Sequence, residues 1–419
     1  MLKHLVLSLL LIAPTSFALS WNLNDVSYLF PLPSSQTEMD LMIHANQNEL
    51  IPVNVYQKIP PMDATGDPKA LYQNARMVAI RIDPCGLSKV SQTCEPQVRL
   101  VWQVLRRSSS STGFTVIDAG MHSFYRLQPA KMKSLLKSLW ELKLEGERQL
   151  PPISTESAAL TIHPAFVNPN FKTHFQSALQ KIILSYCSKN NLIQLTVEES
   201  FPSFVPGAIE PDSASTWMEF SGIEKSHGTW SLIRIPGLTL TPGAARETVQ
   251  KIFNESSETD VEGILTLGAK MSVLPFQSSR SSSLVDSPLP GIINLNEVLN
   301  GSSFNLKDRE LIEGSFKVLR RFQNPKLTHI QNLDCAGCHL ATPAESFLKR
   351  VLPRFESGVM TLKERYLNPN PALYDLSNLS VAAKSTNIFR AFGYWRNYPV
   401  TNQRVINESA ETAAFLNRP

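Results

Sequence analysis

Two thiols and an imidazole fall within one five-residue stretch of the chain, Cys335-Ala336-Gly337-Cys338-His339. Two cysteines separated by two residues and followed directly by a histidine are what covalent haem attachment needs, because each sulfur adds to one vinyl group and the histidine then binds the iron. The sequence therefore predicts one covalently bound haem c, with Cys335 and Cys338 as the attachment sites and His339 as the proximal iron ligand.

Closely spaced cysteines also occur in redox-active disulfides and in zinc sites, and both interpretations fit this stretch less well. A disulfide oxidoreductase places its first cysteine at the start of a helix that follows a buried strand, and residues 327–333 make a poor strand. A zinc site could draw on Cys335, Cys338 and His329, but no second Cys/His pair follows to complete four ligands.

The ligand on the other side of the iron is left open by the sequence. One methionine, Met360, and no histidine follow His339, and His329 lies ten residues before it. Met360 and His329 are therefore alternative second ligands, and an open iron site is the third alternative. Two protein ligands would make the haem an electron carrier, whereas an open site would allow peroxide or gas chemistry.

The N-terminus has the pattern of an export signal. A basic start precedes an apolar run over residues 5–13, and Ser16 and Ala18 are the small residues that signal peptidase reads. We expect residues 1–18 to be a signal peptide cleaved near Ala18, which would deliver the chain to the periplasm or otherwise out of the cytoplasm, where haem c is attached. No later stretch has the apolar length of a membrane span, so none is expected in the mature chain.

The composition is that of a globular protein with more than one folding unit. The chain has 419 residues, of which 42% are hydrophobic and 18% charged, and its formal net charge is +4. Because the lysines and arginines are not gathered into blocks, no nucleic-acid partner is expected. The expected partner is a redox protein of the cell envelope.

Three cysteines lie outside the motif. Cys85 and Cys94 stand at the turn-like ends of a short loop between two apolar runs, and an exported protein can keep a disulfide, so we expect these two to pair. Cys187 ends an apolar helical stretch and is expected to be a buried free thiol.

The hydrophobic periodicity predicts an α+β fold, with an N-terminal α+β part of one or two units with antiparallel sheets. In residues 19–150, strands are expected at 77–82, 98–105 and 114–117, followed by a helix that begins at Pro129. In residues 151–276, a helix is expected over 169–188 and strands over 192–197, 216–223 and 229–235, with a hairpin turn at 225–228. Residues 277–300 are rich in Ser and Pro and are expected to be a linker.

The histidines of this N-terminal part show no catalytic pattern. They are scattered, without an HExxH, a GxSxG or a Gly-rich phosphate loop nearby, so they are interpreted as ordinary surface or core residues. They are His44, His122, His163, His174 and His227.

Residues 301–419 are expected to be a mostly α-helical haem region. Apolar residues recur at helical spacing over residues 306–322, and Thr342 has the position of a helix cap, so the CxxCH motif is expected in a loop between two helices.

A helix, the motif and a second helix resemble the cytochrome c domains in general, over about residues 307–352. The resemblance implies thioether bonds at Cys335 and Cys338 and iron ligation by His339. The chain departs from the common small cytochrome c pattern, which has a glycine and an aromatic residue in the helix before the motif and a methionine well downstream. Met360 is rather close to the motif for that role.

The sequence thus favours an exported monohaem c-type cytochrome-like protein that transfers electrons in the cell envelope, an electron carrier rather than an enzyme. The alternatives are a haem-based sensor or binding protein of the envelope and a peroxidase-like haem enzyme with an open iron site, although dihaem peroxidases carry two CxxCH motifs and this chain has one. Aromatic residues near the C-terminus could wall the haem from water or form ordinary core. They are Phe389, Phe392, Tyr394, Trp395 and Tyr398.

Overall fold

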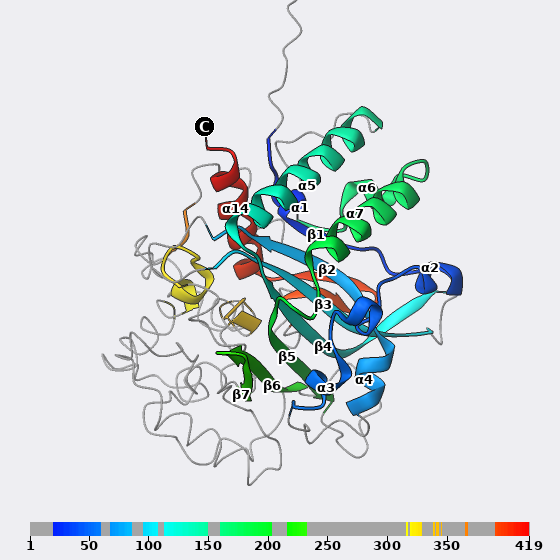
Figure 1. Ribbon diagram of the computed structural model, residues 1–419, viewed down its shortest axis with the longest axis vertical. Coiled ribbons are helices and arrows are strands. Elements are labelled where there is room, and N and C mark those ends of the chain that lie inside the picture. Colours follow the sequence, from blue (N-terminus) through cyan, green and yellow to red (C-terminus); the bar gives the residue numbers. More distant parts are fainter. Residues whose placement is uncertain are drawn as a thin grey trace, which may run out of the picture.

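The computed structural model shows an α+β protein built on a large antiparallel sheet (Figure 1). The structure describes residues 20–59, 68–85, 95–107, 113–149, 160–202, 216–232 and 390–418, together with 316, 319–328, 338–339, 341–342, 345 and 365–367. The α+β class predicted from the hydrophobic periodicity is confirmed for this part of the chain. The predicted signal peptide and linker lie outside it.

In the described part of the chain, seven strands form one sheet in chain order, each antiparallel to the next. They are β1 (Ser27–Leu29), β2 (Ala75–Asp83), β3 (Gln97–Arg107), β4 (Phe114–Arg126), β5 (Leu192–Pro202), β6 (Thr216–Ser226) and β7 (Thr229–Leu232). Because β4 pairs with β5, the strands predicted for residues 19–150 and 151–276 lie in one sheet. The predicted hairpin at 225–228 is confirmed: His227 and Gly228 have φ angles of 49° and 85°, which a two-residue turn between β6 and β7 requires.

Two long helices, α5 (Pro129–Gln149) and α7 (Lys172–Tyr186), pack against each other on one side of the sheet (Figure 1). α5 begins at the predicted Pro129, because a proline in the first turn loses no intrahelical hydrogen bond. The shorter helices of the N-terminal part are α1 (Leu23–Val26), α2 (Gln36–Asp40), α3 (Val53–Tyr56), α4 (Pro68–Asn74), α6 (Pro164–Val167) and the single 3-10 turn η1 (Gln47–Glu49).

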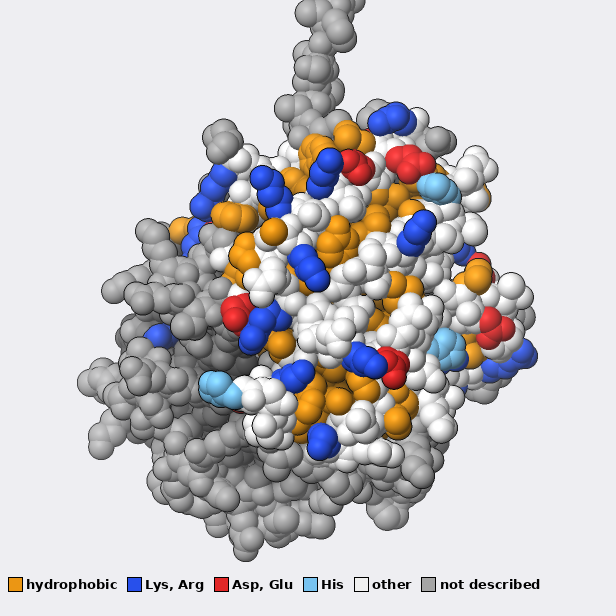
Figure 2. Space-filling view, viewed as in Figure 1, with side chains coloured by type: hydrophobic (Ala, Val, Ile, Leu, Met, Phe, Trp, Pro, Cys, Tyr) orange, Lys and Arg blue, Asp and Glu red, His pale blue; other side chains and the backbone are white. Residues whose placement is uncertain are grey.

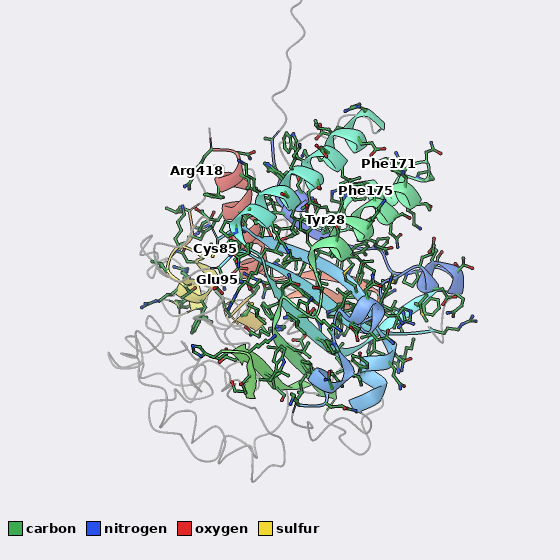
Figure 3. The ribbon with its side chains drawn as sticks, in the orientation of Figure 1. Tyr28, Cys85, Glu95, Phe171, Phe175 and Arg418 are labelled. Atoms are coloured by element: carbon green, nitrogen blue, oxygen red, sulfur yellow. The ribbon has the colours of Figure 1, made fainter. Side chains whose placement is uncertain are left out.

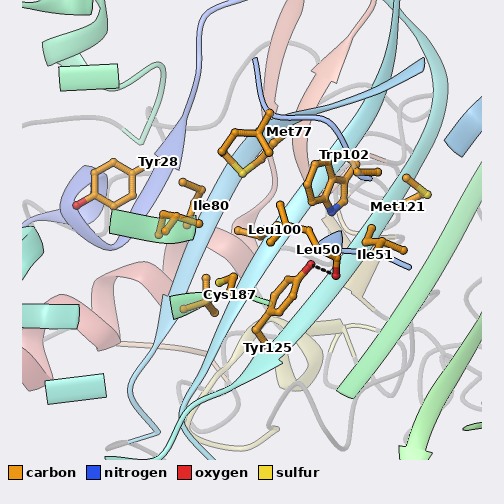
Figure 4. Packing of buried hydrophobic residues seen from close by; sticks show 14 of the residues in the cluster. Tyr28, Leu50, Ile51, Met77, Ile80, Leu100, Trp102, Met121, Tyr125 and Cys187 are labelled. Carbon is orange, nitrogen blue, oxygen red and sulfur yellow. Dashed lines mark hydrogen bonds between the residues drawn. The ribbon is translucent and has the colours of Figure 1, made fainter. Parts of the chain in front are cut away.

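The apolar core lies between these helices and one face of the sheet. Trp102 of β3 and Met121 and Tyr125 of β4 are fully buried there. The polar atoms of this core have partners: the hydroxyl of Tyr125 donates a hydrogen bond to the carbonyl oxygen of Leu50 at 2.9 Å (Figure 4), and the indole N–H of Trp102 donates to Ser123 at 2.8 Å. The core therefore buries large aromatic rings without leaving their polar groups unpaired.

The opposite face of the sheet carries polar residues. Successive residues of a strand point to opposite faces and paired residues share a face, so the neighbours of the core residues face away from the core. This polar face consists of Arg81 and Asp83 of β2, Arg99 and Gln103 of β3, Gly120 and His122 of β4, and Thr196 and Glu198 of β5. Gln103 is 0% and Glu198 3% exposed, so this face is covered although it is polar. Buried polar groups need partners, and these come from the C-terminal residues.

The C-terminal residues cover the polar face as a hairpin, β8 (Phe392–Trp395) and β9 (Tyr398–Thr401), followed by helix α14 (Gln403–Leu416). The side-chain amide of Gln103 donates to the carbonyl oxygen of Tyr394 and accepts from its N–H, both at 2.8 Å. Gly393 makes this approach feasible, because its φ is 147° and a Cβ there would lie 2.6 Å from Oε1 of Gln103. The hairpin is thus bound to the middle of the sheet.

The C-terminal part departs from its helical prediction at two places. The hairpin of β8 and β9 was not expected; it forms because Phe392 and Tyr394, predicted as haem wall or core, are buried against the sheet at 2% and 1% exposure. The CxxCH motif was expected in a loop, with Thr342 as the N-cap of the helix after it, but Cys338, His339 and Thr342 are helical. The Thr342 hydroxyl accepts a hydrogen bond from the N–H of Gln403 in α14, so it has a tertiary partner in place of the predicted capping role.

On the face of the molecule that Figure 2 shows, the charged side chains of the described residues do not gather into one patch. Figure 2 shows lysine and arginine side chains spread over one side of the molecule with hydrophobic side chains between them. Among the described helices, none combines the length and the apolar character that spanning a membrane would take.

Cys187 is a free thiol at 1% exposure, as predicted. Cys85 forms a disulfide, and its predicted partner Cys94 lies outside the described residues, so this pairing stays a prediction. Cys85 and Glu95, which follow β2 and precede β3, lie close together (Figure 3).

Candidate functional site

The second half of the CxxCH motif lies between the polar face and the start of α14. Cys338 and His339 are 7% and 3% exposed. The side-chain amide of Asn402, the N-cap residue of α14, donates to the carbonyl oxygen of Cys338 at 2.7 Å, and the N–H of Gln403 donates to the hydroxyl of Thr342 at 3.0 Å. The first turn of α14 therefore fixes the helical turn that carries Cys338 and His339.

Glu198 of β5 lies between His339 and Arg390. Nδ1 of His339 lies 2.9 Å from Oε2 of Glu198, which is within ion-pair distance. The two atoms do not meet the geometry of a regular hydrogen bond. The other oxygen, Oε1, pairs with the guanidinium of Arg390. Gly120 faces Glu198 on β4 and leaves room for this pair, since a Cβ there would lie 2.8 Å from Nη1 of Arg390 and 2.9 Å from Oε1 of Glu198.

His122 of β4 completes the cluster. The centroid of its ring lies 5.7 Å from that of His339, with 25° between the ring planes. One ligand atom from each of His122, Glu198 and His339 lies within 4.8 Å of the other two. Nε2 of His122 is buried and has no hydrogen-bond partner among the described residues. Burial, followed by the charges of His339 and Arg390, holds the pKa of His122 well below its usual value, so the ring is neutral at pH 7.

The thiol of Cys338 is free and protonated. Burial raises its pKa to about 11, and the charge of Glu408 acts in the same direction, while Arg404, Arg81 and Arg99 oppose it. The attacking thiol of a CxxC redox site is its first cysteine, here Cys335, which lies outside the described residues, so the pKa of Cys338 does not test the redox-disulfide interpretation.

A charged cluster beside Cys338 fastens α14 to the sheet. Glu408 accepts hydrogen bonds from Arg404 of α14 at 2.8 Å and from Arg99 of β3 at 3.1 Å, and it pairs with Arg81 of β2. Burial alone would raise the pKa of Glu408, but the three guanidinium charges outweigh burial and hold that pKa well below its usual range. The carboxylate is therefore charged wherever the protein is folded near neutral pH.

The structure brings together two of the sequence-predicted site residues, Cys338 and His339. Cys85, a further predicted site residue, is described and disulfide-bonded. The remaining predicted residues lie outside the described part of the chain, so their placement stays a prediction. They are Cys94, His329, Cys335 and Met360.

His122, Glu198 and Arg390 were not assigned a role from the sequence. His122 and Glu198 stand at alternate positions of apolar strands, a pattern typical of a strand face in water. Only the C-terminal cover distinguishes the polar face from a solvent-exposed one, and no local signal in the sequence indicates that cover.

The donor set fits a haem c. A metal-binding histidine commonly places its other ring nitrogen against a carboxylate, which fixes the orientation of the ring. Glu198 has this position toward Nδ1 of His339, so Nε2 is the nitrogen through which His339 would bind a metal. Two imidazoles and a carboxylate would also suit a zinc ion, but Glu198 is already paired with Arg390, which makes it a poor ligand.

Comparison with known proteins adds no family. No protein family model matches the chain, and neither the curated proteins nor the solved structures give a match. The function is therefore argued from the site itself.

Proposed function

We propose that the chain is an exported monohaem c-type cytochrome-like protein that carries electrons in the cell envelope, with haem bound through Cys335 and Cys338 and iron bound by His339. The observation that carries this proposal is the histidine of the CxxCH motif, buried at 3% exposure with its Nδ1 2.9 Å from the carboxylate of Glu198. The proposal includes a cytochrome c-like helix, motif and helix in the C-terminal region. Bound haem would supply one-electron chemistry.

The protein's own residues would then hold and tune the iron ligand. The carboxylate of Glu198, 2.9 Å from Nδ1 of His339, would make this imidazole a more basic ligand through its charge, which would favour the oxidised iron. Arg390 limits this effect, because its guanidinium shares the charge of the same carboxylate. Such a balance sets a reduction potential and needs no room for a substrate, as expected for an electron carrier whose partner is a redox protein of the envelope.

The proposal requires a particular cysteine pairing. Cys85 is disulfide-bonded while Cys187 and Cys338 are free, so among the five cysteines the partner of Cys85 is Cys94 or Cys335. A thioether bond at Cys335 demands that Cys85 pairs with Cys94. The closeness of Cys85 to Glu95, the residue after Cys94 in the chain, supports this pairing (Figure 3).

The test is expression of the full chain in a host that attaches haem c, followed by absorption spectroscopy and haem staining of a denaturing gel. We expect a red protein with a Soret band and with haem that remains bound after denaturation. The double variant Cys335→Ala/Cys338→Ala should lose the covalent haem. Cys187→Ala is the matched control, because it removes a buried free thiol on α7's side of the sheet and should keep the haem.

Three results would contradict the proposal. The first is a colourless wild-type protein, and the second is covalent haem that persists in the double variant. The third is a peptide map under non-reducing conditions in which Cys85 is linked to Cys335, since that bond would consume a thiol needed for haem attachment.

A further inference from the structure

His122 is an imidazole beside the proposed iron ligand, and it has no part in the contacts that orient His339. Its ring lies 5.7 Å from the ring of His339, and its Nε2 is buried without a hydrogen-bond partner in the described part of the chain. A buried polar atom that lacks a partner costs about 1 to 3 kcal/mol. This free-energy cost would be removed if Nε2 of His122 bound a ligand.

The sheet holds His122 in a fixed position. β4 is an interior strand, in which His122 is paired with Val101 of β3 on one side and Thr196 of β5 on the other. The ring of Phe124 stands at 66° to the imidazole with 6.5 Å between centroids. A side chain placed on a rigid strand in this way is suited to ligation, because little order has to be created on binding.

The separation of the two histidines suits one shared metal atom. A metal–imidazole bond is about 2 Å long, so two nitrogens bound to one metal atom lie at most about 4 Å apart. One ring nitrogen of His122 lies within 4.8 Å of one ring nitrogen of His339.

Glu198 is not the second ligand, although it belongs to the same cluster. Its Oε1 pairs with Arg390 and its Oε2 contacts Nδ1 of His339. Moving the carboxylate onto a metal would leave Arg390 as a buried charge, and breaking a buried ion pair is strongly unfavourable. Of the three clustered residues, His122 is the one with a buried nitrogen that makes neither a hydrogen bond nor an ion pair within the described part of the chain.

We propose that His122 would bind the haem iron as a second protein ligand, together with His339. This inference rests on the proposed haem attachment, and it selects His122 over Met360 and His329, the two alternatives from the sequence. An iron bound by two imidazoles has no coordination position open to a substrate. The site then transfers electrons and does not bind peroxide or a gas.

The test compares absorption and electron paramagnetic resonance spectra of the full-length haem protein and its variants. The wild type should be low-spin in both oxidation states and should not bind carbon monoxide. His122→Ala should retain the covalent haem, become high-spin and bind carbon monoxide, and added imidazole should restore the low-spin spectrum. His227→Ala, which changes an exposed histidine of the β6–β7 turn, is the control and should behave as the wild type.

A second variant keeps the test decisive if His122→Ala does not fold. His122→Met retains a side chain that can bind iron and should give a low-spin spectrum that differs from the wild type. A red protein whose spectrum is unchanged in both His122 variants overturns the inference and leaves the proposed function intact. A colourless wild-type protein overturns both.

Discussion

Replacing Glu408 tests whether α14 is held to the sheet by charge. Glu408 is the common partner of Arg81, Arg99 and Arg404, and all four side chains are at most 11% exposed. Glu408→Gln keeps the shape of the side chain and removes its charge, so three buried guanidinium groups lose the carboxylate they share. Arg99 keeps a second partner in Asp83, whereas Arg81 and Arg404 form their ion pairs within the described residues with Glu408.

The expected cost follows from the burial of the cluster. Removing one partner of a buried ion pair typically costs about 3 to 5 kcal/mol, because the remaining charge is left in a medium of low polarity. Typical proteins have a free energy of unfolding of about 5 to 15 kcal/mol, so Glu408→Gln should remove a large part of it. Since Asn402 and Gln403 of the same helix hold the turn with Cys338, haem incorporation should fall as well.

The assay is urea unfolding of wild type and Glu408→Gln at pH 7, repeated at lower pH. The pKa of Glu408 is held well below its usual value of 4.5, so its stabilising effect is complete above about pH 4.5 and is lost as the pH falls through the lowered pKa. The difference between the two proteins should therefore shrink below that pH. Glu141→Gln is the control, because Glu141 is 62% exposed and 3.8 Å from Lys137, and it should cost less than about 0.5 kcal/mol. A loss of less than about 1 kcal/mol for Glu408→Gln at pH 7 would refute the reasoning.

Three further predictions concern single side chains. Gly393→Ala should lower the free energy of unfolding, measured in urea, by about 2 kcal/mol or more. The backbone φ at Gly393 is 147°, and the new Cβ would lie 2.6 Å from Oε1 of Gln103. An unchanged free energy of unfolding would contradict the packing of β8 on the sheet. Glu198→Gln should raise the midpoint potential of the haem by about 60 mV or more, a tenfold shift for one electron, because His339 loses the charge that favours oxidised iron; a lower potential in a redox titration would count against this role. Burial lowers the pKa of His163 from 6.5 to about 3, so as the pH falls from 6.5 to 5 this histidine takes up a proton in the unfolded chain but not in the folded protein. The free energy of unfolding should therefore fall by about 2 kcal/mol over this range. His163→Gln should remove this loss when urea unfolding is measured at the two pH values.

The elements of the N-terminal part could be predicted because their signals are local. Apolar alternation in residues 77–82 and 98–105 marks two strands, Pro129 marks a helix start, and the polar stretch at 225–228 marks a hairpin, and each of these is confirmed. The pairing of β4 with β5 could not be read in this way. Alternation shows that a strand has two different faces, but the choice of its neighbour depends on contacts far apart in the chain.

The candidate site shows the same limit more strongly. Five neighbouring residues identify Cys338 and His339, because the spacing of thiols and imidazole is itself the chemical requirement. Glu198 and His122 approach them only after about 140 to 220 residues of intervening chain are folded. On their strands both side chains look like members of a solvent-facing row, so their burial could not be inferred without knowing what covers them.

The polar face explains why the last residues of the chain matter for the site. A sheet with Arg81, Arg99, Gln103 and Glu198 on one face is stable in a folded interior only if every charge and amide finds a partner. Those partners come from residues 390–418, which supply Arg390, Tyr394 and Glu408. The same residues hold the turn with Cys338 and His339, so the segment that satisfies the sheet also completes the site. The turn with Cys338 and His339 is therefore part of the contact between the sheet and α14, and the haem chemistry proposed for it depends on that contact.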